Sequence, residues 1–137
     1  MAYTWSKTLE TGHQATDAQH KQLVDTFNSL MSACVDKKGH AELENTLKFL
    51  CAYTVKHFND EELWQRECNF PEYQKHKLMH DGFKVTATGL YERFRKEGPT
   101  VNLIIQFNTK VGGWLINHIL KEDSKIGLHA KTLNISA

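Results

Sequence analysis

The sequence lacks an excess of either charge, because 17 basic residues nearly balance 16 acidic ones and are interspersed with them. Without a basic stripe, nucleic acids and anionic membrane surfaces are not expected partners. No run approaches about 18 consecutive apolar residues, and the first five residues do not begin a secretory signal. We therefore expect a chain that is neither exported by that route nor inserted in a membrane.

Cysteine is scarce, and the pattern of a disulfide framework or a zinc ribbon is missing. Cys34, Cys51 and Cys68 are odd in number and contain no C-x-x-C spacing. They are expected to be reduced thiols packed in helices, which is typical of a cytoplasmic protein. Strand-like alternation, internal repeats and low-complexity tracts are also lacking.

Apolar residues recur instead at steps of three and four, which predicts amphipathic helices. Four such stripes are present in the 137 residues, and a hydrophobic content of 40% is enough for one core. Short connections between four helices predict an all-α, antiparallel up-down-up-down four-helix bundle with an N-terminal extended segment. Residues 1–137 are accordingly expected to form a single domain.

Helix boundaries are predicted from capping residues, prolines and glycines. The first helix begins with a capping box at residues 16–19 and ends near residues 37–39. The second stripe runs from Leu43 to the turn before Pro71, and the third helix starts at Pro71 and stops at Gly98. The fourth stripe covers residues 101–119. Trp5 is expected to pack over one end of the bundle.

Polar residues interrupt these apolar stripes at informative places. His57 and Glu61 continue the stripe of the second helix, and His76 and His80 begin that of the third. Each pair has an i,i+4 spacing, which places both side chains on one helix face and lets them reach one metal centre. A buried imidazole and carboxylate cluster is costly unless its members are paired or bind a cation. Mixed nitrogen and oxygen donors favour iron.

Some of these signals are weak when taken alone. A single histidine such as His20 is more often hydrogen-bonded or half-exposed than a metal ligand. The His76-x-x-x-His80 pair resembles that of zinc proteases, but Lys77 stands where the catalytic glutamate of that motif belongs. Protease chemistry is therefore disfavoured.

The sequence closely resembles the hemerythrin family, in its bacterial single-domain branch, over nearly its whole length. The matching segments are Asp17-Ala18-Gln19-His20-Lys21, His57-Phe58-Asn59-Asp60-Glu61-Glu62, Pro71 followed by His76 and His80, and Trp114-Leu115-Ile116-Asn117-His118 with Asp123. The resemblance implies two non-heme iron ions with an oxo or hydroxo bridge, and dioxygen as a reversible ligand at one open iron position.

The resemblance also implies a role for each matching residue. One iron is expected on His76, His80 and His118, the other on His20 and His57, with Glu61 and Asp123 bridging the two. The residues expected to wall the dioxygen pocket are Phe58, Trp114, Leu115 and Ile119. Such a wall keeps water and protons away from the bound gas.

Two features of the fourth helix strain this interpretation. Asp123 lies five residues after His118, about 140° around an ideal helix, whereas Glu122 has the easier i,i+4 spacing. The resemblance, and not the geometry, selects Asp123. Gly112 and Gly113 in the same helix should each cost about 1 kcal/mol relative to alanine. Close approach of another helix is one explanation, and widened access to the open iron position is the other.

The leading functional prediction is an oxygen-binding protein, not an enzyme, that stores, delivers or scavenges dioxygen. A sensory module with a signalling partner, complete in this chain or cut from a larger signalling protein, is an alternative. The carrier is preferred because we recognise no output domain in this sequence. A di-iron peroxidase or oxidase is a third possibility, but the expected pocket holds no polar acid or base. Besides dioxygen, the expected partner is an oxygen-using enzyme or a signalling protein.

Overall fold

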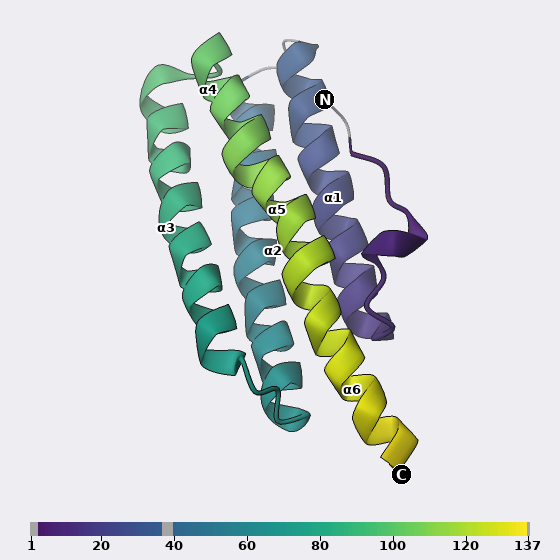
Figure 1. Cartoon of the computed structure of the whole chain (residues 1–137). Helices are drawn as coiled ribbons and strands as arrows, with labels where there is room; N and C mark the ends of the chain where they lie inside the picture. The colour runs from purple at the N-terminus through teal and green to yellow at the C-terminus, as the bar shows by residue number, and fades with distance from the viewer. Residues whose placement is uncertain (1–2, 37–39, 137) are drawn as a thin grey trace.

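A computed structural model describes residues 3–36 and 40–136 of the chain. Three long helices, α1 (Gln14–Val35), α2 (His40–Glu67) and α3 (Tyr73–Glu97), pack beside a fourth rod that runs from Val101 to Ser136. Successive helices alternate in direction, as the colours in Figure 1 show. The predicted all-α, antiparallel four-helix bundle is confirmed.

The fourth rod is not a uniform α-helix. It consists of α4 (Val101–Phe107), η2 (Asn108–Gly113), α5 (Trp114–His118), η3 (Ile119–Asp123) and α6 (Ser124–Ser136), and both η2 and η3 are π-helical. A π-helix closes its hydrogen bonds from residue i to i+5 and occurs often at functional sites. The rod therefore carries one widened segment in its first half and another immediately after His118.

The start of α1 differs from the predicted capping box. The helix begins at Gln14, and the Asp17 carboxylate in its first turn accepts hydrogen bonds from the backbone N–H groups of Thr11 (2.8 Å) and Gly12 (3.1 Å). Asp17 thus fixes the preceding turn rather than residues further along the helix. The predicted end of this helix at residues 37–39 lies outside the described residues.

The ends of α3 agree partly with prediction. Gly98 ends the helix as expected, with a left-handed φ of 75° that favours glycine. The helix begins at Tyr73 and not at Pro71, because Pro71 still belongs to the turn that follows Cys68.

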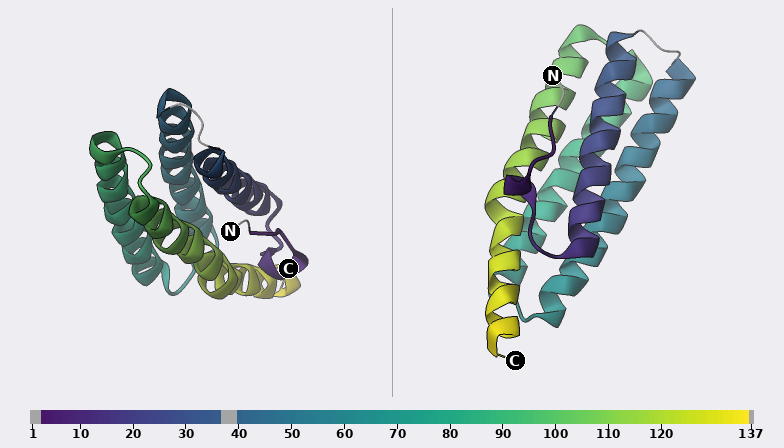
Figure 2. Two further views of the ribbon diagram at one scale, coloured as in Figure 1. Left: turned by 90° about the horizontal axis from the view of Figure 1, so that it is seen from above. Right: turned by 90° about the vertical axis from the view of Figure 1, so that its right-hand side faces the viewer.

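The N-terminal segment lies along the bundle and not over its end. Figure 2 shows this segment between α1 and the fourth rod. The backbone N–H of Tyr3 donates to Asn28 Oδ1 (2.9 Å), and Asn28 Nδ2 donates back to the Tyr3 carbonyl (2.8 Å). Trp5 is half-buried against the side of the main core. The predicted place of Trp5 over a bundle end is therefore wrong.

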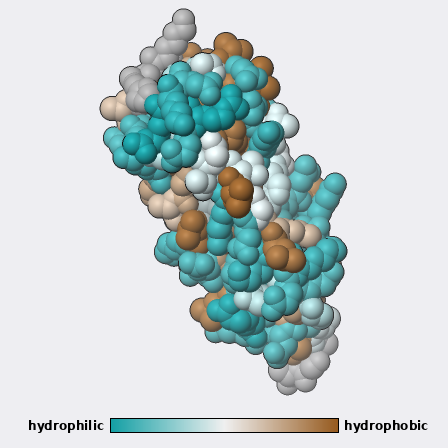
Figure 3. All heavy atoms as spheres, turned by 90° about the vertical axis from the view of Figure 1, so that its left-hand side faces the viewer, coloured by the Kyte–Doolittle hydropathy of each residue, from teal (hydrophilic) through white to brown (hydrophobic). Residues whose placement is uncertain are grey.

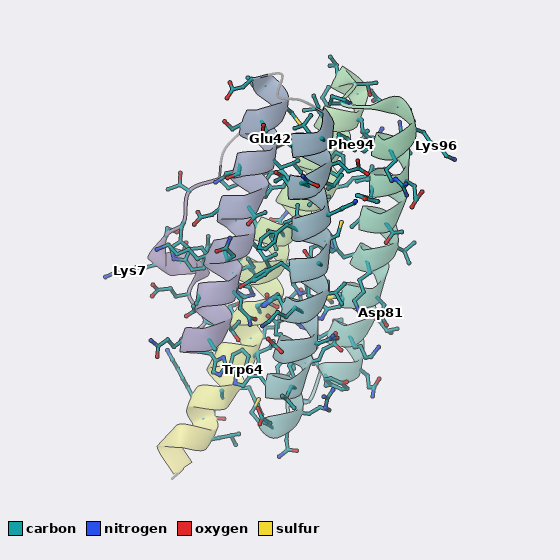
Figure 4. The ribbon with its side chains drawn as sticks, turned by 180° about the vertical axis from the view of Figure 1, so that it is seen from behind. Lys7, Glu42, Trp64, Asp81, Phe94 and Lys96 are labelled. Carbon is teal, nitrogen blue, oxygen red and sulfur yellow. The ribbon has the colours of Figure 1, made fainter. Side chains whose placement is uncertain are left out.

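The core is apolar over most of the bundle length. Phe94 lies toward one end of it and Trp64 toward the other (Figure 4), and a second small cluster joins Trp64 to Cys68, Phe70 and Ile126. All three cysteines are free. On the face that α3 contributes, hydrophobic side chains stand apart among hydrophilic ones (Figure 3). Among the described residues, no helix combines the length and apolar character needed to cross a membrane.

The two glycines of η2 have different surroundings. A Cβ on Gly112 would lie 2.5 Å from the ring of Phe27 and 2.8 Å from that of Tyr3, whereas a Cβ on Gly113 would meet nothing closer than 3.7 Å. Gly112 is therefore explained by the close approach of α1 and the N-terminal segment. Widened access to a metal does not have to be invoked for it.

We expect Gly112→Ala to destabilise the protein by about 1–3 kcal/mol, because the added methyl group overpacks the contact with the Phe27 ring. Gly89→Ala is the matched control, since Gly89 lies in α3 with nothing within 4 Å of its Cβ position. That control should stabilise the protein by about 0.4–1 kcal/mol. Denaturant unfolding of the two variants measures both effects, and equal stabilities would contradict the close-approach explanation.

Candidate metal centre

The seven polar residues singled out in the sequence converge on one buried region. α1 contributes His20, α2 contributes His57 and Glu61, and α3 contributes His76 and His80. The fourth rod contributes His118 from α5 and Asp123 from η3. None of the seven is more than 6% exposed. They form two overlapping groups with metal-binding geometry: Glu61, His76, His80, His118 and Asp123 in one, and His20, His57, Glu61 and Asp123 in the other.

Glu61 belongs to both groups because its two oxygens face opposite ways. Its Oε2 lies 3.1 Å from His20 Nε2 and 3.2 Å from His57 Nε2. Its Oε1 lies 3.0 Å from His76 Nε2 and 3.1 Å from His80 Nε2. One carboxylate thus presents one oxygen to each group of histidines.

Asp123 repeats this arrangement from the other side. Its Oδ2 lies 3.0 Å from His20 Nε2, while its Oδ1 lies 3.0 Å from His76 Nε2 and 3.1 Å from His118 Nε2. Each group therefore receives one oxygen from each carboxylate. This is the arrangement that two neighbouring cations bridged by two carboxylates require.

The π-helical segment η3 explains how Asp123 reaches this position. Asp123 lies five positions after His118, and the i to i+5 hydrogen bonding of a π-helix brings residues at this spacing onto one face. Glu122 is half-buried instead, and its carboxylate pairs with Lys125 Nζ at 3.2 Å. The spacing that strained an ideal helix is thus accommodated by a local change of helix type.

The charges of the group call for a cation. Burial lowers the pKa of His20, but hydrogen bonds to Asp123 and Glu61 outweigh this effect and raise the pKa to about 10. The same balance raises the pKa of His76 to about 9. Burial raises the pKa of both carboxyl groups, yet the surrounding histidines hold each pKa well below its usual range. For His57, burial prevails and lowers the pKa. Two buried carboxylates thus demand positive charge, which protons or metal ions can supply.

The donor atoms also converge in a way that suits metal ions better than hydrogen bonds. Nε2 of His76 lies 3.0 Å from Nε2 of His118. The same nitrogen lies 3.0 Å from Glu61 Oε1 and 3.0 Å from Asp123 Oδ1, so it has more close partners than one N–H can serve. His80 Nε2 and Asp123 Oδ1 lie about 3 Å from neighbouring donors or acceptors without a well-oriented hydrogen bond. Lone pairs that point at a common centre are what a bound cation would need, and imidazole with carboxylate is a donor set that suits iron.

Two of the four residues predicted to wall a pocket contact this cluster. The Phe58 ring stacks on His80 at 3.8 Å between ring centroids, and the Trp114 ring stacks on His118 at 4.3 Å. Leu115 and Ile119 are buried in the main core, 6% and 0% exposed. Two of the four wall residues thus contact histidines of the larger group.

Two functional neighbours were not assigned a role from the sequence. Glu62 Oε2 accepts a hydrogen bond from His80 Nδ1 at 2.9 Å, and Gln19 Oε1 accepts one from His57 Nδ1 at 2.7 Å. Both residues lie directly beside a cluster residue in the sequence. Both also lie in segments that match the family, but neither continues the apolar stripe of its helix, so periodicity assigned them no role.

Comparisons with known proteins agree with the geometry. A family model described as the hemerythrin HHE cation binding domain matches residues 11–127. A bacteriohemerythrin of Pseudomonas aeruginosa is 31% identical over 120 residues, which are 88% of this chain and 76% of that protein. One of Methylococcus capsulatus is 31% identical over 112 residues, covering 81% and 82%.

A solved structure of wild-type hemerythrin superimposes with a TM-score of 0.82 at 26% identity and covers 95% of this chain and 98% of its own. The family model spans most of the chain and includes every residue of the buried cluster. From this match and from the relatives at 31% identity, we conclude that the chain belongs to the hemerythrin family.

Proposed function

We propose that this chain binds two non-heme iron ions in the buried cluster and binds dioxygen reversibly there, for storage, delivery or scavenging. The observation that carries the proposal is the division of each carboxylate between two groups of histidines. In this proposal His76, His80 and His118 hold one iron, His20 and His57 hold the other, and Glu61 and Asp123 bridge them. Residues 1–137 are proposed to form one domain around this centre.

The donor count makes the two iron positions unequal. The larger group offers three imidazole nitrogens and two carboxylate oxygens, and the smaller one offers two nitrogens and two oxygens. If two irons with an oxo or hydroxo bridge were held there, the iron on His20 and His57 would have one protein donor fewer and would leave room for an added ligand. When bound, the iron pair supplies the electrons that dioxygen binding requires.

The residues proposed to wall the pocket would keep water away from bound dioxygen. The rings of Phe58 and Trp114 stack on His80 and His118, and Leu115 and Ile119 are buried side chains of the fourth rod. A dry wall protects a reversible gas complex because entering water or protons promote irreversible oxidation. Hemerythrin-family proteins are oxygen-binding proteins rather than enzymes, which agrees with the expectation that this chain is not an enzyme.

The cellular setting and the partners are part of the same proposal. Three free thiols suit a reducing cytoplasm. The proposed partner is an oxygen-using enzyme that takes up the delivered gas, or a signalling protein if the iron state is sensed.

We expect the purified protein to hold two irons per chain, because seven side chains in two groups offer more donors than one octahedral ion accepts. Metal analysis after expression in iron-supplemented medium checks the number. A single zinc per chain would contradict the proposed centre.

Glu61→Ala should lose more iron and more thermal stability than Glu67→Ala. Glu61 is the proposed bridge, whereas Glu67 is an exposed glutamate at the end of the same helix. Metal binding is coupled to folding in such sites, so the loss of a bridge lowers both quantities. Iron analysis and thermal unfolding measure them. If both variants kept equal iron, Glu61 would not be a ligand.

Leu115→Ala should retain its iron but oxidise faster in air. The truncation opens a cavity that costs about 2–5 kcal/mol of stability and admits water to the wall. Leu128→Ala is the control, since Leu128 is 64% exposed on the same rod. Optical spectra followed after air is added to the reduced proteins give the oxidation rate at several pH values. A wild-type rate in Leu115→Ala would show that this leucine does not seal the pocket.

A further inference from the structure

Two histidines of the cluster each form a hydrogen bond through Nδ1, on the side that faces away from the cluster, and the two acceptors differ in charge. His80 and His57 both direct Nε2 toward Glu61, at 3.1 and 3.2 Å. On the outer side, His80 Nδ1 contacts the Glu62 carboxylate and His57 Nδ1 contacts the Gln19 side-chain oxygen. A carboxylate and an amide oxygen only accept, so each Nδ1–H donates and each Nε2 is left free for a cation.

The orientation of the Gln19 amide follows from its other contact. Gln19 Nε2 donates to Asp60 Oδ2 at 2.8 Å, and Lys56 Nζ lies 2.9 Å from the same Asp60 oxygen. The amide nitrogen therefore faces Asp60, and the amide oxygen faces His57. The hydrogen-bond acceptor of His57 Nδ1 is thus a neutral amide. The negatively charged Asp60 contacts the far end of that amide and is paired with Lys56.

The Glu62 carboxylate contacts His80 directly. Its side chain is 7% exposed, and its Oε2 lies 2.9 Å from His80 Nδ1. Hydrogen bonds to an ionised acceptor are about twice as strong as neutral ones and polarise the donor more. In a buried place, water screens such a charge only weakly.

The His80 ring is also fixed without Glu62. It stacks on the Phe58 ring at 3.8 Å with an angle of 4° between the ring planes. Exchange of the Glu62 carboxylate for an amide of the same shape would therefore leave the ring in place. Charge and orientation can be separated at this residue.

We infer that Glu62 acts through His80 and makes the group of His76, His80 and His118 richer in electrons than the group of His20 and His57. Its effect comes from its charge and not from holding the ring in place. This inference rests on the proposed di-iron centre. A carboxylate behind His80 gives the imidazole more anionic character, and an anionic ligand stabilises iron(III) relative to iron(II). Glu62 thereby favours oxidation of the iron that His80 binds.

Glu62→Gln tests the charge alone. We expect the ratio of reduced to oxidised iron at a given applied potential to rise about tenfold, which is about 59 mV for a one-electron step. Iron loss to an added chelator should become about 10–100-fold faster, the usual effect of changing such an outer partner. Redox titration with mediators and chelator-trapping kinetics measure the two changes.

The reciprocal variant moves a charge toward the other histidine. Gln19→Glu combined with Asp60→Asn keeps the net charge, places a carboxylate on His57 and leaves an amide at position 60 to donate to it. The ratio of reduced to oxidised iron should fall, opposite to the effect of Glu62→Gln. Asp60→Asn alone isolates the effect of position 60 on the Gln19 amide, and the exposed Glu67→Gln is the control that should change little.

The outcomes separate the two proposals. Absence of two irons from the wild-type protein would overturn the proposed function itself. A wild-type protein with two irons, together with a Glu62→Gln variant that has wild-type potential and chelation rate, would overturn only the role of Glu62. Shifts of the same sign in Glu62→Gln and in the double variant would also overturn it. If Glu62→Gln fails to retain iron, the double variant still decides, since Gln19 is half-buried and remote from Glu62 in the sequence.

Discussion

The burial of two carboxylates beside five histidines is the constraint on which the rest of this structure depends. Glu61 and Asp123 are each 1% exposed, and an uncompensated buried carboxylate costs several kcal/mol or more. Compensation requires imidazoles from every helix of the bundle at one level. Long helices, short connections and an apolar core on the remaining length meet that requirement. The fold can therefore be understood as a scaffold that holds one polar layer, stabilised by packing elsewhere.

The part of the site that follows helical periodicity could be predicted from the sequence. His57 with Glu61, and His76 with His80, share helix faces at i,i+4, and the structure brings all four together. Asp123 could not be predicted in this way, because a π-helical segment is not encoded in a 3.6-residue repeat. Only the family resemblance selected it over Glu122. The π-helical segment is less stable than an α-helix would be, and the contacts that Asp123 makes with the histidines offset this loss of stability.

Features that depend on neighbours distant in the sequence could be predicted only in part, for a different physical reason. Close approach of another helix was one of two explanations offered for the glycine pair in η2, but no pattern in the fourth stripe identifies Phe27 as the residue that approaches Gly112. The N-terminal segment likewise follows α1 through contacts of Tyr3 with Asn28. Polar partners such as Glu62 lie off the apolar stripe, so periodicity assigns them to the surface until the packing of α2 on α3 is known.

The two histidine groups differ in ways that reinforce one another. The larger group has one more imidazole donor, and aromatic rings stack on two of its members, with Phe58 on His80 and Trp114 on His118. The outer partner of its member His80 is a carboxylate, whereas the outer partner of His57 is an amide. More donors and closer ring cover favour a closed position, and greater negative charge favours loss of an electron. The smaller group has fewer donors, and this favours the addition of a ligand. In the proposed di-iron centre, His20 and His57 would hold the iron to which a small molecule adds, and Glu62 would lie behind the iron from which electrons are drawn.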